Sequence, residues 1–360
     1  MTPPLDFHHA DESRAARVAV IAEAGVNHNG SVEEAVRLIE AAADAGADAV
    51  KFQRFDPDTL LADGAGLAAY QEGSDATDAA SLLRPLVLPE DAWPRLLDAA
   101  EARKLAFVVT PFSPADCAAL RPLAPHLAAI KTASPDAVNP PLLEAAASLG
   151  RPLIASTGAC RLGELGPAAD AVRAAGPGSA LLHCVSAYPT PPGEAALGGV
   201  AALRAAFGLP TGYSDHTAGE GTGALAVAAG ACVLEKHLTL DRGAPGPDHA
   251  ASLEPRALAR YAAAARAAAA AVGPLRKEPS AAEAGVAAVA RQSVAAARDL
   301  PAGHTLRGED LTVMRPGTGV PAARLGELVG RRLPGAVRAG CLLPVGTLPR
   351  VVPGASPGGP

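Results

Sequence analysis

Aromatic residues are scarce in this sequence, which has six Phe, four Tyr and one Trp among 360 residues. Ala, Gly and Pro are abundant instead, and this compositional bias carries little information about function. The five Cys are widely separated, and no Cys-x-x-Cys pair occurs. The sequence therefore indicates neither a disulfide framework nor a thiolate metal site.

An excess of positive charge is also absent, because the formal net charge is −6. This balance argues against a nucleic-acid-binding surface and against a polybasic membrane contact. No run of about 18 apolar residues free of charges and turn signals occurs, so the sequence predicts no membrane span. We therefore expect a protein of the cytoplasm.

Short β-rich runs alternate with Ala/Leu-rich helical stretches from residue 16 onward, which is typical of βα units and a parallel sheet. Eight strands over roughly 255 residues favour a closed barrel over an open, doubly wound sheet. The sequence therefore predicts an α/β fold, a (β/α)8 TIM barrel. Its predicted strands are residues 18–25, 48–53, 105–112, 128–134, 152–158, 180–186, 210–215 and 231–237.

The rest of the chain is predicted to flank this barrel as separate segments. Short β runs between Pro-Gly turns indicate a small, mostly-β domain near the carboxyl end. The stretch 55–80, between the second and third predicted strands, is unusually long, and we expect it to be a lid or substrate loop. The predicted segments are a disordered leader (1–15), the barrel (16–275), a linker (276–290), the mostly-β domain (291–350) and a disordered tail (351–360).

Two His follow neighbouring predicted strands near the end of the barrel sequence. His216 comes directly after the run 210–215, and His237 ends the run 231–237. The carboxyl ends of barrel strands face one pocket and imidazole is a common metal ligand, so the two His are a candidate metal site. The alternative is that each is only a hydrogen-bonded residue of the core or rim. Ionisable residues crowd beside them and favour chemistry: Asp215, Glu235, Lys236 and Asp248.

Two Lys lie within predicted strands, where an unpaired ammonium is costly unless an anion compensates it. Lys51 and Lys131, with three Ser hydroxyls, form a candidate phosphate cradle. The alternative is that each Lys pairs with a carboxylate such as Glu23 or Glu235. Further candidates are the cradle hydroxyls of Ser134, Ser156 and Ser214, the substrate contacts Gln53, Thr110 and Tyr188, and the acid/base carboxylates Glu23, Asp136 and Asp248.

A series of short motifs occurs in a fixed order along the chain: IAEAGVNHNG, AGADAVKFQ, TPFS, IKTAS, ASTGA, LLHCVSAYPTP, GYSDHT, EKHLTLD and PGPDH. So many motifs in one order are more specific than any single motif. The series resembles the sialic acid synthases, which condense phosphoenolpyruvate with an N-acylated hexose. The segment 291–350 is similar to the antifreeze-like or SAF domain that these enzymes carry, so the resemblance covers residues 18–350.

The resemblance implies a product of the N-acetylneuraminate type and a domain-swapped homodimer. It also implies a divalent metal, commonly manganese, with magnesium or cobalt as alternatives. It suggests that His216 and His237 bind the metal, that Glu23 and Asp248 lie near the sugar, and that Gln53 and Tyr188 line the sugar side. The suggested phosphoenolpyruvate contacts are Lys51, Lys131, Ser134, Ser156 and Ser214. Arg315 of the SAF domain is suggested to enter the neighbouring active site.

Three positions depart from the family pattern. Asp136 stands where the family has Glu, the loop offers YQ at 70–71 and SD at 74–75 in place of an Asn, and Met314 replaces a Lys. The first two concern the sugar side, so the acceptor is N-acetylmannosamine or a diacetamido-6-deoxyhexose leading to legionaminic or pseudaminic acid. Two other functions stay open: another metal-dependent barrel aldolase or isomerase, and a non-catalytic carbohydrate-binding protein.

Overall fold

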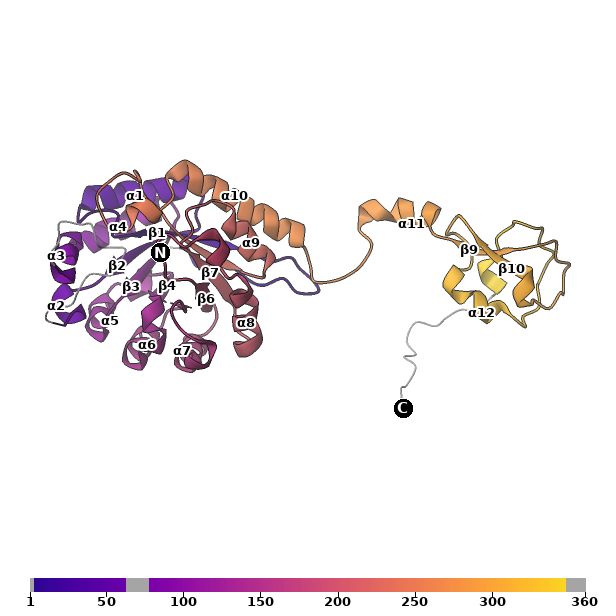
Figure 1. Cartoon of the computed structure of the whole chain (residues 1–360), viewed down its shortest axis with the longest axis horizontal. Helices are drawn as coiled ribbons and strands as arrows, with labels where there is room; N and C mark the ends of the chain where they lie inside the picture. The colour runs from indigo at the N-terminus through magenta and orange to yellow at the C-terminus, as the bar shows by residue number, and fades with distance from the viewer. Residues whose placement is uncertain (1–2, 63–77, 348–360) are drawn as a thin grey trace. The chain divides into compact units, whose positions relative to one another are not determined.

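The computed structural model describes residues 3–62 and 78–347, and its contacts separate two compact units, 1–276 and 277–360. The first unit is a closed barrel of eight parallel strands paired in chain order (Figure 1), which confirms the predicted fold. The strands are β1 (Ala19–Gly25), β2 (Ala49–Arg54), β3 (Ala106–Pro111), β4 (Ala129–Thr132), β5 (Leu153–Ser156), β6 (Ala180–Cys184), β7 (Thr211–Asp215) and β8 (Val233–His237).

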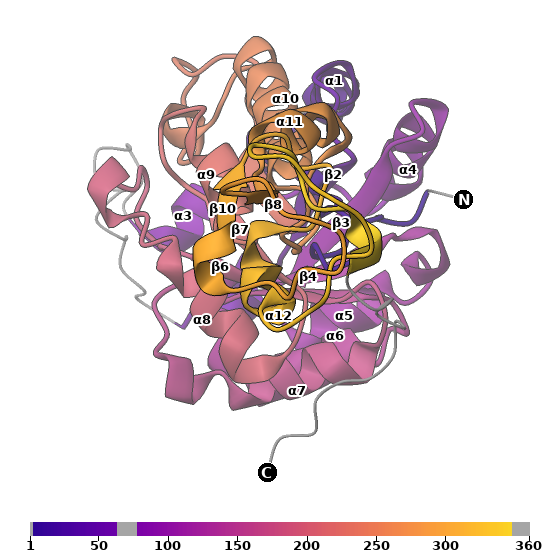
Figure 2. The same cartoon turned by 90° about the vertical axis from the view of Figure 1, so that its right-hand side faces the viewer.

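Helices between the strands form a ring around the barrel (Figure 2). Ser31, Ser113 and Asn139 begin three of these helices, and each side chain accepts a hydrogen bond from a backbone amide of the first turn. The ring consists of α1 (Val32–Asp44), α4 (Ala92–Ala102), α5 (Pro114–Leu120), α6 (Pro140–Ala147), α7 (Gly166–Ala175), α8 (Gly198–Phe207), α9 (Thr222–Ala228) and α10 (Pro255–Val272).

The connection between β2 and α4 is the long one that the sequence predicts. It contains two short helices, α2 (Pro57–Leu60) and α3 (Ala79–Leu83). The remainder of the predicted lid or substrate loop, with the pairs at 70–71 and 74–75, lies outside the described residues.

Successive side chains of a strand point to opposite faces, so every second residue of a barrel strand points inward and the inward side chains form layers. One layer is apolar and forms a floor. The residues two positions later on the same strands also point inward, but they are polar. The site therefore stands directly on an apolar layer. The floor residues Ile21, Ala49, Val108, Ile154 and Val233 are followed in this way by Glu23, Lys51, Thr110, Ser156 and Glu235.

The amino-terminal residues pack against this apolar floor. Leu5 and Phe7 contact it, and the backbone pairs antiparallel between His8 and Arg17. The structure thus differs from the predicted disordered leader over residues 3–15, because two apolar side chains cover a surface that the barrel would otherwise expose.

The second unit contains a small antiparallel sheet packed around an apolar core, and its described residues otherwise form short helices, turns and loops. It contains α11 (Ala284–Ala290), β9 (Ser293–Ala296), β10 (Leu311–Met314) and α12 (Leu325–Leu328), with β9 and β10 antiparallel. The core includes Val294, Leu306, Val320 and Leu343. The predicted linker 276–290 contains helix α11. Over the described residues of both units, no helix is long and apolar enough to cross a membrane.

Candidate active site

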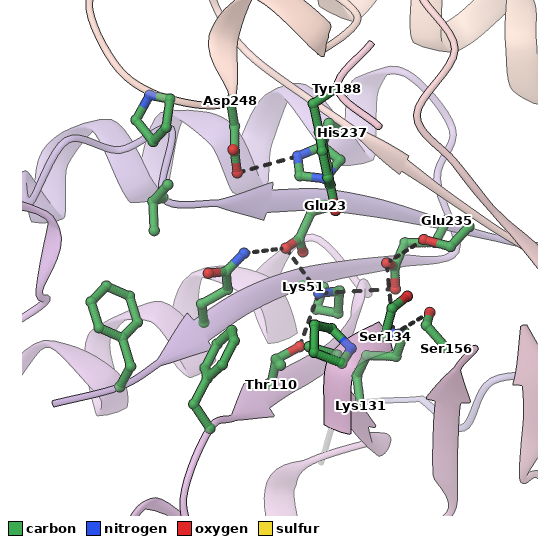
Figure 3. Close-up of a pocket in the computed structure, with 18 of the residues that line it drawn as sticks. Glu23, Lys51, Thr110, Lys131, Ser134, Ser156, Tyr188, Glu235, His237 and Asp248 are labelled. Carbon is green, nitrogen blue, oxygen red and sulfur yellow. Dashed lines mark hydrogen bonds and ion pairs between the residues drawn. The ribbon is translucent and has the colours of Figure 1, made fainter. Parts of the chain in front are cut away.

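A cavity of about 260 Å³ lies at the carboxyl ends of the barrel strands (Figure 3). Every predicted site residue except Asp136 and Arg315 lines it. The sequence-based candidates from distant segments are therefore brought to one place. The lining comprises Glu23, Val26, Lys51, Gln53, Phe55, Leu60, Leu83, Thr110, Phe112, Lys131, Ala133, Ser134, Pro135, Ser156, Tyr188, Ser214, His216, Glu235, His237, Pro247 and Asp248.

Glu23 and Lys51 form a buried ion pair at the centre of the cavity, with 2.8 Å between Lys51 Nζ and Glu23 Oε1. Gln53 Nε2 donates to the same carboxylate oxygen at 2.9 Å, and Lys51 donates to Thr110 Oγ1 at 2.9 Å. Burial raises the pKa of Glu23, although Lys51 opposes this shift. Lys51 therefore has the carboxylate partner that the sequence left as an alternative to phosphate.

Lys131 also lines the cavity, but among the described residues no carboxylate lies as close to it as Glu23 lies to Lys51. Its Nζ donates to Ser156 Oγ at 2.6 Å and to the Thr132 carbonyl at 2.7 Å, whereas Glu235 Oε1 is 3.9 Å away. Burial lowers the pKa of Lys131. A charged ammonium held this way has an incomplete counter-charge, so an anionic ligand would compensate it.

Glu235 lines the site, although the sequence suggested it only as an ionisable neighbour of the two His and as a possible lysine partner. It lies between the two lysines, 3.9 Å from Lys51 and 3.9 Å from Lys131, and accepts a hydrogen bond from Ser214 at 3.1 Å. Burial opposes its charge, but the two lysines hold its pKa below the usual value. Its position two residues before His237 on β8 was the signal that could have placed it at the site, because alternate residues share a face.

The two imidazoles stand side by side above β7 and β8, with 5.3 Å between the ring centroids of His216 and His237. His216 Nδ1 donates to the Val185 carbonyl at 3.0 Å, which leaves its Nε2 lone pair available to a ligand. The Tyr188 ring lies 4.1 Å from the His216 ring and covers it. Burial holds the pKa of His237 well below its usual value, so that ring is neutral and able to coordinate.

These donors fit a divalent metal held by the protein through two imidazoles. His237 Nδ1 is buried without a hydrogen-bond partner, and Asp248 Oδ2 lies 3.5 Å from it. The described residues contain no cluster of three or more His, Cys, Asp or Glu arranged around one point. The remaining coordination positions would therefore go to water or substrate oxygens.

Two carboxylates and a glycine shape the side of the cavity next to His237. A Cβ built on Gly25 would lie 3.1 Å from Glu23 Oε1 and 3.4 Å from Asp248 Oδ2, so both oxygens face the space that the glycine leaves open. Burial raises the pKa of Asp248 to about 6, and the nearby charge of Glu23 adds to this shift. This carboxyl is able to exchange a proton near neutral pH.

Two candidates lie elsewhere. Asp136 belongs to the 3-10 turn η4 (Ser134–Val138), accepts a hydrogen bond from Asn139 Nδ2 at 3.1 Å, and does not line the cavity in the described chain. Arg315 directly follows β10 in the second unit, where its side chain is exposed.

The sequence analysis also missed an apolar part of the cavity lining, which is formed by Val26, Phe55, Leu60, Leu83 and Phe112.

Comparison with known proteins finds the same two-part organisation. The NeuB family model matches residues 38–277, and the SAF domain model matches residues 291–344. An N,N'-diacetyllegionaminic acid synthase of Legionella pneumophila is 39% identical over 90% of this chain and 92% of its own length. An N-acetylneuraminate-9-phosphate synthase of Mus musculus is 32% identical over 87% and 88%.

A solved structure agrees with these matches. The N-acetylneuraminic acid (sialic acid) synthetase of Leptospira borgpetersenii is 31% identical, with a TM-score of 0.69 over 78% of this chain and 96% of its own. The similarity therefore extends through fold as well as sequence.

Proposed function

This chain belongs to the NeuB family and carries a SAF domain, and from that premise we propose that it condenses phosphoenolpyruvate with an N-acylated hexose. The products are a nine-carbon 2-keto-3-deoxy sugar acid and phosphate. The observation that carries the proposal is one cavity that holds two buried lysines, three serine hydroxyls and a pair of imidazoles. An aldolase or isomerase without phosphoenolpyruvate would leave the incomplete counter-charge of Lys131 without an anionic ligand.

The phosphate side of the site is assigned to Lys131 and the three hydroxyls. Lys131 already contacts Ser156, and Ser134 and Ser214 line the same cavity. An ammonium with short hydroxyl donors binds a phosphate that keeps its charge throughout the reaction. Held in this way, C3 of phosphoenolpyruvate attacks the aldehyde carbon of the open-chain sugar, water adds at C2, and the C2–O bond to phosphate breaks.

The imidazole side is assigned to the aldehyde. His216 and His237 would hold a divalent metal, which we propose to be manganese with magnesium or cobalt as alternatives. When bound, it would supply Lewis-acid polarisation of the aldehyde oxygen. Asp248 lines the cavity beside His237 and is placed to give a proton to the oxygen that becomes the new hydroxyl. Glu23 and Gln53 bind sugar hydroxyls, and Tyr188 covers the imidazoles and excludes water.

We propose further that the acceptor is a diacetamido-6-deoxyhexose and the product an N,N'-diacetyllegionaminic acid. The sequence alone places N-acetylmannosamine first. The higher identity to a legionaminic acid synthase, 39% against 32% for an N-acetylneuraminate-9-phosphate synthase, supports this change of acceptor. Asp136 directly follows the lining residues Ser134 and Pro135, and its part in the choice between these acceptors stays a prediction.

A domain-swapped homodimer, in which Arg315 completes the partner's site, remains part of the proposal. It is supported by the SAF match and by the exposed position of Arg315 after β10. A cytoplasmic location likewise stays a prediction.

Phosphate release from phosphoenolpyruvate tests the reaction directly. With Mn²⁺ present, release should depend on an added acceptor and disappear with a chelator. The three acceptors are N-acetylmannosamine and the two diacetamido-6-deoxyhexoses that lead to legionaminic and pseudaminic acids. No phosphate release with any of the three acceptors, for a folded and metal-loaded protein, would overturn the proposed function.

A further inference from the structure

Five apolar side chains line one part of the active-site cavity, and the proposed reaction gives them no role. Val26 and Phe55 are buried, with exposures of 4% and 6%, while Leu60, Leu83 and Phe112 are half-buried. They belong to a single apolar cluster, in which the Phe55 and Phe112 rings meet edge to face with centroids 6.0 Å apart. We refer to these five residues as the apolar wall.

The apolar wall lies on a different arc of the barrel mouth from Lys131 and the three Ser hydroxyls of the phosphate cradle. Val26, Phe55 and Phe112 follow β1, β2 and β3, and Leu60 and Leu83 lie on α2 and α3. Lys131, Ser156 and Ser214 belong to β4, β5 and β7, and Ser134 directly follows β4, whereas Lys51 lies on β2 and is paired with Glu23. Because the eight strands pair in chain order, these two arcs lie on different sides of the barrel mouth. A ligand bound at the imidazoles can therefore contact the wall at a distance from the phosphate.

Among the described residues, the cavity lining contains no arginine and no lysine other than Lys51 and Lys131. The ammonium groups that line the described cavity belong to Lys51 and Lys131, which contact Glu23 and Ser156. The nearby Arg54 and Arg84 do not line this cavity, because Arg54 pairs with Glu90 and Asp116 and Arg84 pairs with Asp58. Against the wall side chains that the structure describes, a phosphate or a hydroxyl would lose water without gaining a partner, whereas a methyl group would gain by burial.

We propose that the apolar wall receives the methyl groups of the acceptor, its 6-deoxy carbon and an N-acetyl methyl. The wall thereby selects a doubly acylated 6-deoxyhexose over N-acetylmannosamine and over N-acetylmannosamine 6-phosphate. This inference rests on the proposed function, because it assigns the far end of the same acceptor. Leu60, Leu83 and Phe112 are the specificity-determining residues, since their partly exposed side chains are the ones a ligand can reach.

The kinetic test changes the polarity of the wall. Leu83→Asn replaces an apolar side chain by a polar one with the same branching and number of heavy atoms, and Leu162→Asn is the control, because Leu162 is exposed and outside the cavity lining. We expect kcat/KM to favour the diacetamido-6-deoxyhexose over N-acetylmannosamine by about tenfold or more in the unmodified protein. Leu83→Asn should remove most of this preference by lowering only the first value, and Leu162→Asn should leave it intact.

A binding test separates this inference from the proposed reaction. Reduced acceptors, in which the aldehyde is an alcohol, cannot react, and calorimetry measures their affinity directly. Tighter binding of the 6-deoxy alditol, lost in Leu83→Asn, supports the wall even if no phosphate is released. Equal binding of the 6-deoxy and 6-hydroxy alditols, or an equal effect of Leu83→Asn on both, would overturn the wall while leaving the condensation reaction standing.

Discussion

Asp215 and Lys236 form an ion pair on the outer side of the barrel, each one residue before an imidazole of the site. Their Oδ1 and Nζ atoms are 3.2 Å apart, and both side chains are fully buried. The two residues are register partners on β7 and β8. Asp215 accepts hydrogen bonds from the Thr217 amide and hydroxyl at 2.9 and 2.7 Å, and Lys236 donates to the Thr217 carbonyl. The pair thus fixes the backbone on both sides of His216.

Removing one member of this pair should destabilise the protein strongly. Lys236→Met leaves a buried, uncompensated carboxylate, so the free energy of unfolding should fall by about 3–5 kcal/mol. The double variant Asp215→Asn with Lys236→Met removes both charges and should recover much of this loss. Urea denaturation followed by circular dichroism measures both, and a single variant as stable as the unmodified protein would contradict the expectation.

The imidazole pair should be required for metal binding. His216→Ala or His237→Ala should weaken Mn²⁺ binding and turnover by more than about 100-fold, since loss of a ligand exceeds the usual effect of an outer partner. Mn²⁺ titration without substrate gives a readout independent of activity. His126→Ala, at an exposed position, is the matched control. Full activity in His216→Ala would refute the assignment.

A side chain at Gly25 should block the sugar side of the cavity. Gly25 has φ of +51°, and an added Cβ would crowd Glu23, Gln53 and Asp248. Gly150 has φ of +67° and nothing within 4 Å of the corresponding position, so Gly150→Ala carries the backbone strain alone. Each variant should lose about 1–2 kcal/mol of stability. Only Gly25→Ala should also lose turnover of the acceptor. Equal kcat/KM in the two variants would argue against a role of the space beside Gly25 in sugar binding.

The stability of the barrel should fall in mild acid because of His9. Its Nε2 accepts a hydrogen bond from the Thr211 amide at 2.9 Å, which requires a neutral ring, and burial lowers its pKa to about 4. Below pH 6.5 the unfolded chain therefore binds more protons than the folded one, so this contribution is lost as the pH falls from about 6.5 towards 4. His9→Gln keeps an acceptor that does not titrate and should flatten the dependence of Tm on pH.

Burial also lowers the pKa of His28 to about 4. The slope of Tm against pH should therefore decrease in His9→Gln without disappearing. An unchanged slope would show that His9 does not contribute.

If Arg315 acts in the neighbouring site, two inactive proteins should complement each other. Arg315→Ala keeps an intact barrel, and His237→Ala keeps an intact SAF domain. Random subunit exchange should restore roughly a quarter of the normal rate, because half of the dimers are mixed and each has one complete site. No recovery after exchange is verified by mass spectrometry would point to a role within one subunit, or none.

The barrel and most of the cavity lining could be predicted because their signals are local. The β-rich runs recur at regular spacing, and Glu23, Lys51 and Glu235 each stand on the inward face of a strand. This reasoning ends where the strand ends. Asp136 follows β4 on a 3-10 turn, so the alternation of faces no longer determines its direction.

The apolar wall could not be predicted, because an apolar residue after a strand looks like any core residue. Phe55 and Phe112 directly follow β2 and β3, and the pairing of these two strands is what brings the rings together. The same holds for the amino-terminal residues, whose composition suggests disorder. Their order depends on the apolar floor of a barrel that forms from residues much later in the sequence.

The pairing of the first strand with the last also has a consequence during synthesis. Glu23 and His237 are register partners, and the Leu238 amide donates to the Glu23 carbonyl at 2.8 Å. At ribosomal rates, roughly 10–40 s pass between the emergence of these two residues. During this time β1 has one unpaired edge, which is a template for aggregation. The nascent chain is therefore expected to depend on chaperones until β8 has left the ribosome.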